Sequence, residues 1–335
     1  MNRSATARLL LSPLSVVYGM YVKVRTWLYA RGWLRQKRLR GTVISIGNLT
    51  VGGTGKTPMV VWLAERLHAR GKTVAILSRG YRGSDGTSDE IELMKQRLQD
   101  QVEFGIGKNR FLEGKRIESQ RKIDAFLLDD GFQHLALARD LDIVLIDASR
   151  EMAKERLLPA GNLREPFSAM MRANLLVFTR VENAPEARAA IQKMGKIPVF
   201  AAETRLVGFR LLGGDTTIFQ AEKLGAGPFF AFCGIGNPEA FFRDLGIWGL
   251  PVAGTRIFRD HFRYGAKDIA LLERAAAQAN AKAFVTTEKD AQNLAGVRSP
   301  SIPVYVTVID LELGQEADLL DLVERALETR TEAAG

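Results

Sequence analysis

The sequence predicts an α/β protein, with a doubly wound, mainly parallel sheet and a second, smaller α/β lobe. Three observations lead to this prediction. Short β-rich runs without polar alternation recur along the chain, as is typical of buried parallel strands. Helix-like stretches lie between several of these runs. A glycine-rich turn joins the first run to the first such stretch, so the sheet begins as a strand–loop–helix unit.

The first forty residues carry all of the chain's excess positive charge. Net charge is +9, from 47 basic and 38 acidic residues, and this segment holds nine basic residues and no Asp or Glu. Leucine, valine, tyrosine and tryptophan lie between the charges. Basic flanks around apolar and aromatic residues are typical of a segment that lies in a bilayer interface. We therefore expect residues 1–40 to form a basic, amphipathic, membrane-associating helix.

This segment is too short to span a bilayer. Its uncharged stretch, residues 9–22, would extend roughly 20 Å at ~1.5 Å per residue, against about 30 Å of hydrocarbon. Pro13 also disfavours a long unbroken helix. A cleaved signal peptide is disfavoured because no small-residue cleavage site precedes Arg31. The other interpretations are a helix that docks on the protein's own core and, less favoured, a nucleic-acid-binding module.

The rest of the chain divides into a core at 41–185, a second α/β lobe at 186–325 that closes over a cleft, and a frayed tail at 326–335. The predicted strands of the core are residues 43–46, 73–77, 125–128, 143–146 and 175–178. Those of the second lobe are residues 199–201, 229–232, 283–287 and 304–308. Helices are predicted at 59–70 and 266–280. A single cysteine, Cys233, fits a reducing compartment.

The turn at residues 47–58 is the most informative motif. Its backbone N–H groups would line one concavity, as in a P-loop, which suits a polyphosphate better than an ordinary strand–helix turn does. Lys56 would reach the β- and γ-phosphates, and the Thr57 hydroxyl would bind Mg²⁺. Thr50 stands where this pattern usually has glycine. The predicted ATP-binding residues are Thr50, Gly52, Gly53, Thr54, Gly55, Lys56 and Thr57.

Carboxylates at strand ends form a second group. Asp129 and Asp130 directly follow a buried strand, where a P-loop fold holds Mg²⁺ directly or through water. We therefore predict that both bind the metal together with Thr57, although a turn or helix cap would also use Asp. Asp147 ends a similar run, and a structural role is favoured there.

Six motifs appear in a characteristic order. They are residues 52–58, 77–81, 129–134, 158–166, 234–238 and 287–290. Together they resemble the tetraacyldisaccharide 4′-kinase family of lipid A biosynthesis, and the resemblance runs from the N-terminus to about Asp290. It implies an ATP- and Mg²⁺-dependent lipid kinase at the cytoplasmic face of an inner membrane, peripheral or monotopic. The acceptor would be the 4′-hydroxyl of a tetraacylated glucosamine disaccharide 1-phosphate. No nucleic acid and no obligate protein partner are expected.

The resemblance also assigns catalytic roles. Lys56 contacts the transferring phosphate, Asp89 takes the proton of the sugar hydroxyl, and His261 supports it. This chain reads Ser88-Asp89-Glu90-Ile91 where relatives read Gly-Asp-Glu-Pro. The alternative for Asp89 is a helix N-cap or first-turn residue.

Substrate contacts are expected at Arg79, Tyr81, Arg164 and Glu165, although each arginine would also suit a surface ion pair. His134, which follows the acidic doublet, is expected either to position other groups of the site or to take part in catalysis, and it is not assigned to the proton-transfer pair. Residues 286–290 are expected to line the nucleoside site.

A soluble P-loop NTPase or GTPase switch is the alternative enzyme class. A GTPase normally reads guanine with an Asn-Lys-x-Asp segment. The segment Thr287-Glu288-Lys289-Asp290 lacks that spacing, which favours the lipid kinase.

Overall fold

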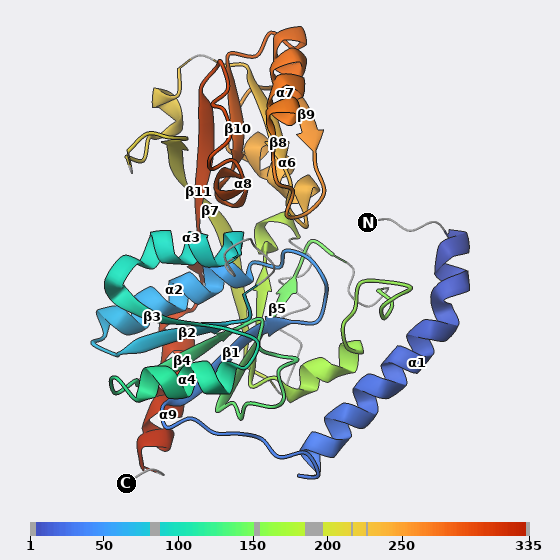
Figure 1. The fold of residues 1–335 in the computed structure, drawn as a ribbon, viewed down its shortest axis with the longest axis vertical. Helices are drawn as coiled ribbons and strands as arrows, with labels where there is room; N and C mark the ends of the chain where they lie inside the picture. The colour runs from blue at the N-terminus through green and yellow to red at the C-terminus, as the bar shows by residue number, and fades with distance from the viewer. Residues whose placement is uncertain are drawn as a thin grey trace. The chain divides into compact units, whose positions relative to one another are not determined.

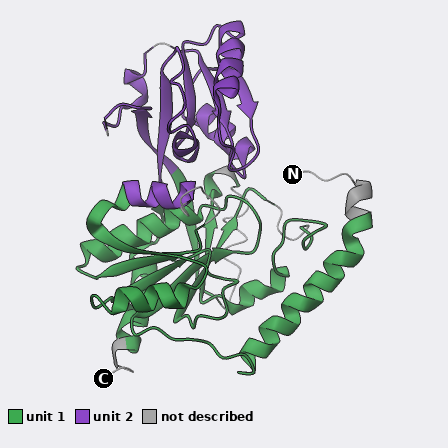
Figure 2. Cartoon of the chain, in the orientation of Figure 1, with its two compact units in different colours: residues 1–87, 97–204, 311–335 green, residues 88–96, 205–310 purple. Residues whose placement is uncertain are grey.

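The computed structural model describes residues 5–80, 88–150, 155–184, 197–215, 217–225 and 227–332. The chain forms two compact units (Figure 2). Unit 1 comprises residues 1–87, 97–204 and 311–335, and unit 2 comprises residues 88–96 and 205–310. This division differs from the contiguous domains expected at 41–185 and 186–325. A short early segment belongs to unit 2, and the end of the chain returns to unit 1.

Unit 1 is built on parallel strands, most of which are almost wholly buried. They are β1 Thr42–Asn48, β2 Val74–Ser78, β3 Val102–Ile106, β4 Ala125–Asp129, β5 Leu141–Asp147, β6 Leu175–Thr179 and β7 Val199–Leu211, in the order β3-β2-β4-β1-β5-β6-β7. Apolar residues in these strands do not alternate with polar ones, because helices cover the sheet. Strand β3 was not predicted: it lies at the edge of the sheet, and its centre is only half-buried.

The helices of unit 1 that lie in the described part of the chain are α1 Ala5–Ala30, α2 Lys56–Ala69, α4 Arg110–Glu118 and α9 Glu316–Glu332 (Figure 1). Ile117 of α4 packs in one cluster with Phe126 and Leu128 of β4. Two ion pairs connect helix α9 to α2 and its C-cap: Arg66 of α2 pairs with Glu316, and the C-cap residue Arg70 pairs with Glu324. Helix α9 continues to Glu332, through most of the tail that was expected to fray.

Unit 2 has a smaller parallel sheet. Its strands are β8 Phe229–Cys233, β9 Val252–Ile257, β10 Ala283–Thr287 and β11 Val304–Leu313, in the order β11-β10-β8-β9. Its helices are α6 Pro238–Ile247, α7 Ala266–Gln278 and α8 Glu288–Asn293, together with most of α3 Asp89–Leu98. Strand β9 escaped prediction because it is an edge strand whose residues alternate between half-buried and exposed. Short 3₁₀ turns lie at Gln99–Gln101, Phe167–Arg172, Val181–Asn183 and Ala221–Lys223.

The α/β fold class predicted from the sequence is thus confirmed. One expectation about α1 is wrong: Pro13 lies inside an unbroken helix. Proline costs that helix one backbone hydrogen bond, and packing of the inner face against unit 1 compensates, with Ser15 and Gly19 buried. No helix in the described part of the chain combines the length and hydropathy needed to cross a bilayer.

Candidate active site

The phosphate loop connects β1 to α2 and needs glycine at two of its positions. Gly52 has φ 113° and Gly55 has φ 85°, both left-handed conformations that side chains with a Cβ rarely adopt. Thr54 is fixed from both sides: its hydroxyl accepts a hydrogen bond from the Asn48 amide at 2.8 Å, and its carbonyl accepts one from the Thr179 hydroxyl at 3.1 Å. The loop is therefore held in shape before any ligand binds.

Thr50 stands in place of the usual glycine, and its backbone pairs with another segment of the chain. It forms an isolated antiparallel bridge with Leu163 and is 1% exposed. The Val51 N–H donates to the Asn162 carbonyl at 2.8 Å, and the Arg164 N–H donates to the Leu49 carbonyl at 2.7 Å. An extended, β-branched residue suits such a bridge. The segment around Leu163 is thus a structural part of the phosphate site.

Asp130 lies at the centre of the charged groups of unit 1. Its Oδ2 accepts a hydrogen bond from Arg164 Nη1 at 2.6 Å, and its Oδ1 lies 3.5 Å from Lys56 Nζ. Burial raises the pKa of the Asp130 carboxyl, but Lys56 and Arg164 outweigh this effect, so that the pKa lies below its ordinary value. The carboxylate is therefore ionised at neutral pH. The structure brings together three of the residues that the sequence assigned to phosphate, metal and substrate.

The predicted metal ligands offer only oxygen atoms. Asp129 ends β4 and accepts a hydrogen bond from the Ser78 hydroxyl at 2.9 Å, and Thr57 is the second residue of α2. Among the described residues, the buried Asp130 Oδ1 has the Lys56 ammonium 3.5 Å away but accepts no geometrically defined hydrogen bond, so it retains capacity for a metal ligand bond. Carboxylate and hydroxyl oxygens suit Mg²⁺, which takes its remaining ligands from phosphate and water. No group of three or more His, Cys, Asp or Glu that suits a metal occurs among the described residues.

Arg110 is a site residue that the sequence analysis missed. It is 7% exposed at the start of α4, and the Asn109 side chain caps that helix by accepting from the Leu112 N–H. Burial lowers the pKa of Arg110, and the nearby charge of Arg79 adds to this effect. A buried guanidinium beside Asp129 and Asp130 suits a phosphate group. The Asn-Arg pair before a helical stretch was the only signal in the sequence.

His134 is neutral at physiological pH. Burial, together with the charges of Arg110 and Arg139, lowers its pKa to about 4. It therefore remains uncharged and serves as a neutral neighbour of these arginines. Tyr81, a predicted substrate contact, lies outside the described residues.

Glu165 is buried and accepts hydrogen bonds from other side chains of the protein. It is 4% exposed, accepts from the Gln133 amide at 3.1 Å and from Arg172 Nη2 at 2.7 Å. The same Gln133 amide donates to the Asn48 carbonyl at 3.0 Å, at the entrance to the phosphate loop. These contacts assign Glu165 a positioning role, and a direct contact with substrate stays a prediction.

Unit 2 brings Asp89 and His261 together, although 172 positions separate them in the chain. His261 Nδ1 lies 3.0 Å from Asp89 Oδ1 and 3.1 Å from Oδ2, and Asn293 donates to Oδ2 at 3.2 Å. The Asp89 side chain is 6% exposed and that of His261 is 48% exposed. Asp89 is the first residue of α3, but the Ser88 hydroxyl accepts the Ile91 N–H and so takes the cap. Asp89 is therefore available to the histidine.

Electrostatics favour the charged forms of this pair. Burial raises the pKa of Asp89, but the hydrogen bond with His261 and the charge of Lys289 lower it by more. The hydrogen bond to Asp89 raises the pKa of His261, and burial opposes this. A carboxylate that holds an imidazole in this way orients it and takes part in proton transfer.

Lys289 belongs to the segment 286–290 that the sequence assigned to the nucleoside site, and in the structure it contacts the Asp89–His261 pair. Its Nζ lies 3.2 Å from Asp260 Oδ1, 3.3 Å from His261 Nε2 and 3.9 Å from Asp89 Oδ2. The neighbouring Asp290 fixes this segment, because it accepts hydrogen bonds from the Gly234 N–H and the Tyr264 hydroxyl, each at 2.7 Å. In this structure residues 286–290 thus support the Asp89–His261 pair, and their role in binding the nucleoside stays a prediction.

Comparison with known proteins identifies the family of this chain. The family model described as tetraacyldisaccharide-1-P 4′-kinase matches residues 7–328. The chain belongs to this family. A tetraacyldisaccharide 4′-kinase from Geobacter metallireducens is 41% identical, over 95% of this chain and 98% of the relative, and one from Geobacter sulfurreducens is 39% identical, over 96% and 95%. The crystal structure of the "apo" form of LpxK from Aquifex aeolicus in complex with ATP covers 96% of this chain and 99% of its own, with a TM-score of 0.75 and 29% identity.

Family membership confirms the resemblance seen in the sequence. The chain is an ATP-dependent kinase of lipid A biosynthesis that acts on a lipid A precursor, and the NTPase or GTPase switch is not favoured. The family also implies that the kinase uses Mg²⁺ with ATP.

Proposed function

We propose that the kinase transfers the γ-phosphate of ATP to the 4′-hydroxyl of a tetraacylated glucosamine disaccharide 1-phosphate. The hydrogen-bonded Asp89–His261 pair is the observation that supports this best, because an alcohol acceptor needs a group that takes its proton. A hydrolytic switch would need only to position water.

The reaction is a simple exchange of P–O bonds. The 4′-oxygen forms a bond to the γ-phosphorus while the bond to the bridging oxygen of ADP breaks, and the hydroxyl proton passes to the Asp89–His261 pair. Lys56 and Arg164 neutralise charge on the phosphates, and Asp130 keeps both cations in place. Mg²⁺, held by Thr57, Asp129 and Asp130, would neutralise further charge when bound. Positioning and electrostatics supply most of the catalysis in such transfers.

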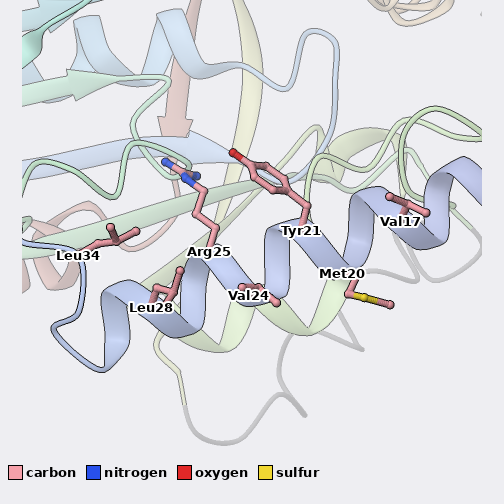
Figure 3. Close-up of a pocket in the computed structure, with 7 residues that line it drawn as sticks. All are labelled: Val17, Met20, Tyr21, Val24, Arg25, Leu28 and Leu34. Carbon is pink, nitrogen blue, oxygen red and sulfur yellow. The ribbon is translucent and has the colours of Figure 1, made fainter.

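We also propose that the kinase acts at the cytoplasmic face of the inner membrane, attached peripherally through α1. The outer face of this helix is apolar and exposed: Leu10 is 74% exposed, Val17 65% and Met20 61%. An apolar groove of about 540 Å³ lies along it, lined by Val17, Met20, Tyr21, Val24, Arg25, Leu28 and Leu34 (Figure 3). Together with the basic residues of this segment, such a groove suits the acyl chains and anionic headgroups of lipid. Neither nucleic acid nor an obligate protein partner forms part of the proposal.

Product analysis tests the proposal directly. The full chain is incubated with ATP, Mg²⁺ and a tetraacylated disaccharide 1-phosphate in detergent, and lipid products are identified by mass spectrometry. We expect ADP and a lipid with one added phosphate at the 4′ position in equal amounts. ADP release without a phosphorylated lipid would indicate an NTPase instead.

A further inference from the structure

The inner face of α1 makes polar contacts with unit 1. Ser15 Oγ donates to the Leu157 carbonyl at 3.0 Å and accepts from the Ala160 N–H at 2.9 Å. The Tyr18 hydroxyl donates to the Arg164 carbonyl at 2.8 Å. Both contacting residues lie on one side of the helix, since a spacing of three places side chains on the same face. Gly19 completes this face, and a Cβ there would lie 2.8 Å from the Leu157 side chain.

Arg25, which follows Tyr18 along α1, also makes a polar contact with unit 1. Both of its terminal nitrogens lie 3.2 Å from the Gln133 carbonyl. The amide of Gln133 in turn holds the Asn48 carbonyl and Glu165. The helix therefore reaches both segments that support the phosphate loop.

Arg164 is the point at which these contacts converge. Its carbonyl accepts the Tyr18 hydroxyl, its N–H donates to the Leu49 carbonyl in the phosphate loop, and its guanidinium binds Asp130 at 2.6 Å. Burial raises the pKa of Tyr18, and the charge of Glu165 adds to this, so the hydroxyl stays protonated and able to donate. One residue thus connects α1, the loop and the charged centre.

We propose that Tyr18 is a positioning residue for phosphoryl transfer: its hydrogen bond fixes the Arg164 backbone and so holds the Arg164 guanidinium on Asp130. This inference rests on the proposed function. Catalytic groups lose effectiveness when their orientation is not fixed, and small displacements reduce rates strongly. Helix α1 then helps to position the groups of the active site, in addition to its proposed contact with the membrane. The simpler alternative is that Tyr18 only docks the helix.

The experiment compares three variants of the full chain. Tyr18→Phe removes the hydroxyl and keeps the ring. Ser15→Ala removes a docking contact that does not reach Arg164. Tyr305→Phe removes the same hydroxyl from β11, where the ring packs against Phe229 in the core of unit 2. For each we measure kcat, the KM values for lipid and ATP, the thermal unfolding temperature, and amide hydrogen exchange of peptides covering residues 157–165.

Tyr18→Phe should lower kcat roughly 3- to 10-fold, as expected for one positioning hydrogen bond, with little change in the KM for lipid. Exchange at residues 157–165 should accelerate in this variant. Ser15→Ala should cost less activity, and Tyr305→Phe should resemble the wild type. Equal losses in Tyr18→Phe and Ser15→Ala would assign the effect to helix docking and overturn the proposal. So would a loss confined to the KM for lipid, or unchanged kcat and exchange in Tyr18→Phe.

The exchange measurement uses the protein alone. If the wild type forms no phosphorylated lipid, the proposed function fails, while the exchange rates still report whether Tyr18 restrains residues 157–165. If the lipid product forms but Tyr18→Phe changes neither rate nor exchange, only the role of Tyr18 fails.

Discussion

At the scale of single residues, the two charged centres of this kinase share an unusual backbone conformation. Asp130 adopts φ 51° directly after β4 and lies between Lys56 and Arg164. His261 also has a left-handed backbone, with φ 57°, and reaches Asp89. Non-glycine residues rarely adopt this conformation, and it recurs at functional sites because the surrounding contacts determine it.

The acidic doublet should control the Mg²⁺ dependence of the reaction. Asp129→Asn and Asp130→Asn should each lower kcat and shift the Mg²⁺ titration to higher concentration, because an amide is a weaker ligand for a hard cation. Asp215→Asn, a change to an exposed carboxylate in unit 2, is the control. Activity is measured as lipid product at a series of Mg²⁺ concentrations. An unchanged titration in both doublet variants would make the doublet structural.

The Asp89–His261 pair should behave as one unit. Asp89→Asn and His261→Ala should each reduce kcat far more than they raise KM, and the double variant should be little worse than the more damaging single one. Asn caps helices as well as Asp does, and Ser88 already caps α3. Any loss of kcat in Asp89→Asn therefore reports the loss of the proton-accepting carboxylate and not the loss of a helix cap. We measure kcat and KM for the two single variants and the double variant, and thermal unfolding checks that each variant is folded. An active Asp89→Asn enzyme would place the base elsewhere.

Lys289 should set the pH dependence of that pair. Its charge is one of the factors that lower the pKa of Asp89, and it also lowers the pKa of His261. Lys289→Met should therefore raise both pKa values, and the acid limb of kcat, where Asp89 must be ionised, should move to higher pH. Lys95→Met removes a lysine that pairs with Glu92 on α3 and serves as the control. An acid limb that stays in place would contradict this role for Lys289.

At the scale of elements, α1 has two faces with different partners. Its inner face bonds residues that flank the phosphate loop, and its outer face leaves an apolar groove exposed. The sequence pattern favoured a membrane segment and kept a docking helix as the alternative. The structure shows docking, and membrane attachment stays a proposal that rests on the outer face.

Two changes to α1 should separate these faces. Deletion of residues 1–34 should abolish pelleting with anionic phospholipid vesicles and also weaken ATP binding several-fold, because the contacts of Tyr18 and Arg25 are lost. The double change Val17→Glu and Val24→Glu should abolish pelleting but preserve ATP affinity, since both side chains are exposed. Pelleting of the deletion variant would refute the anchor. Identical ATP affinity in the deletion variant would refute the inner-face coupling.

At the scale of the whole molecule, the chain leaves unit 1 and returns to it. Residues 311–335, which follow the residues of unit 2 in the sequence, belong to unit 1. Helix α9 contributes the buried side chains Leu319, Leu320, Val323 and Leu327, and Arg330 donates to the Leu39 carbonyl at 2.8 Å. The last helix therefore stabilises the unit that carries the phosphate loop.

A core variant of α9 tests this dependence. Leu320 is 1% exposed, so Leu320→Ala should reduce the free energy of unfolding by about 2–5 kcal/mol. The neighbouring Asp321 is exposed, and Asp321→Ala should change stability by less than about 0.5 kcal/mol. Urea unfolding is followed by tryptophan fluorescence, to which Trp62, buried in α2 of unit 1, contributes. Equal stability of the two variants would show that α9 is dispensable for unit 1.

The sequence by itself determined the elements that local pattern specifies. Buried strands such as β10 were predicted because an apolar run without polar alternation has one stable environment. The phosphate loop was recognisable because glycine conformations and the lysine lie within a few residues of one another. The edge strands β3 and β9 escaped prediction because their partly exposed residues mix polar and apolar types.

Only the tertiary structure decided which distant residues meet. Nothing local in the sequence indicates that Tyr18 reaches Arg164, 146 positions away, or that Lys289 reaches His261. Likewise, Thr50 could be understood only once its backbone was seen to pair with Leu163. Such contacts depend on the order of strands in the sheet and on the path of the loops between them. They are set by the packing of the whole chain, which no short stretch of sequence contains.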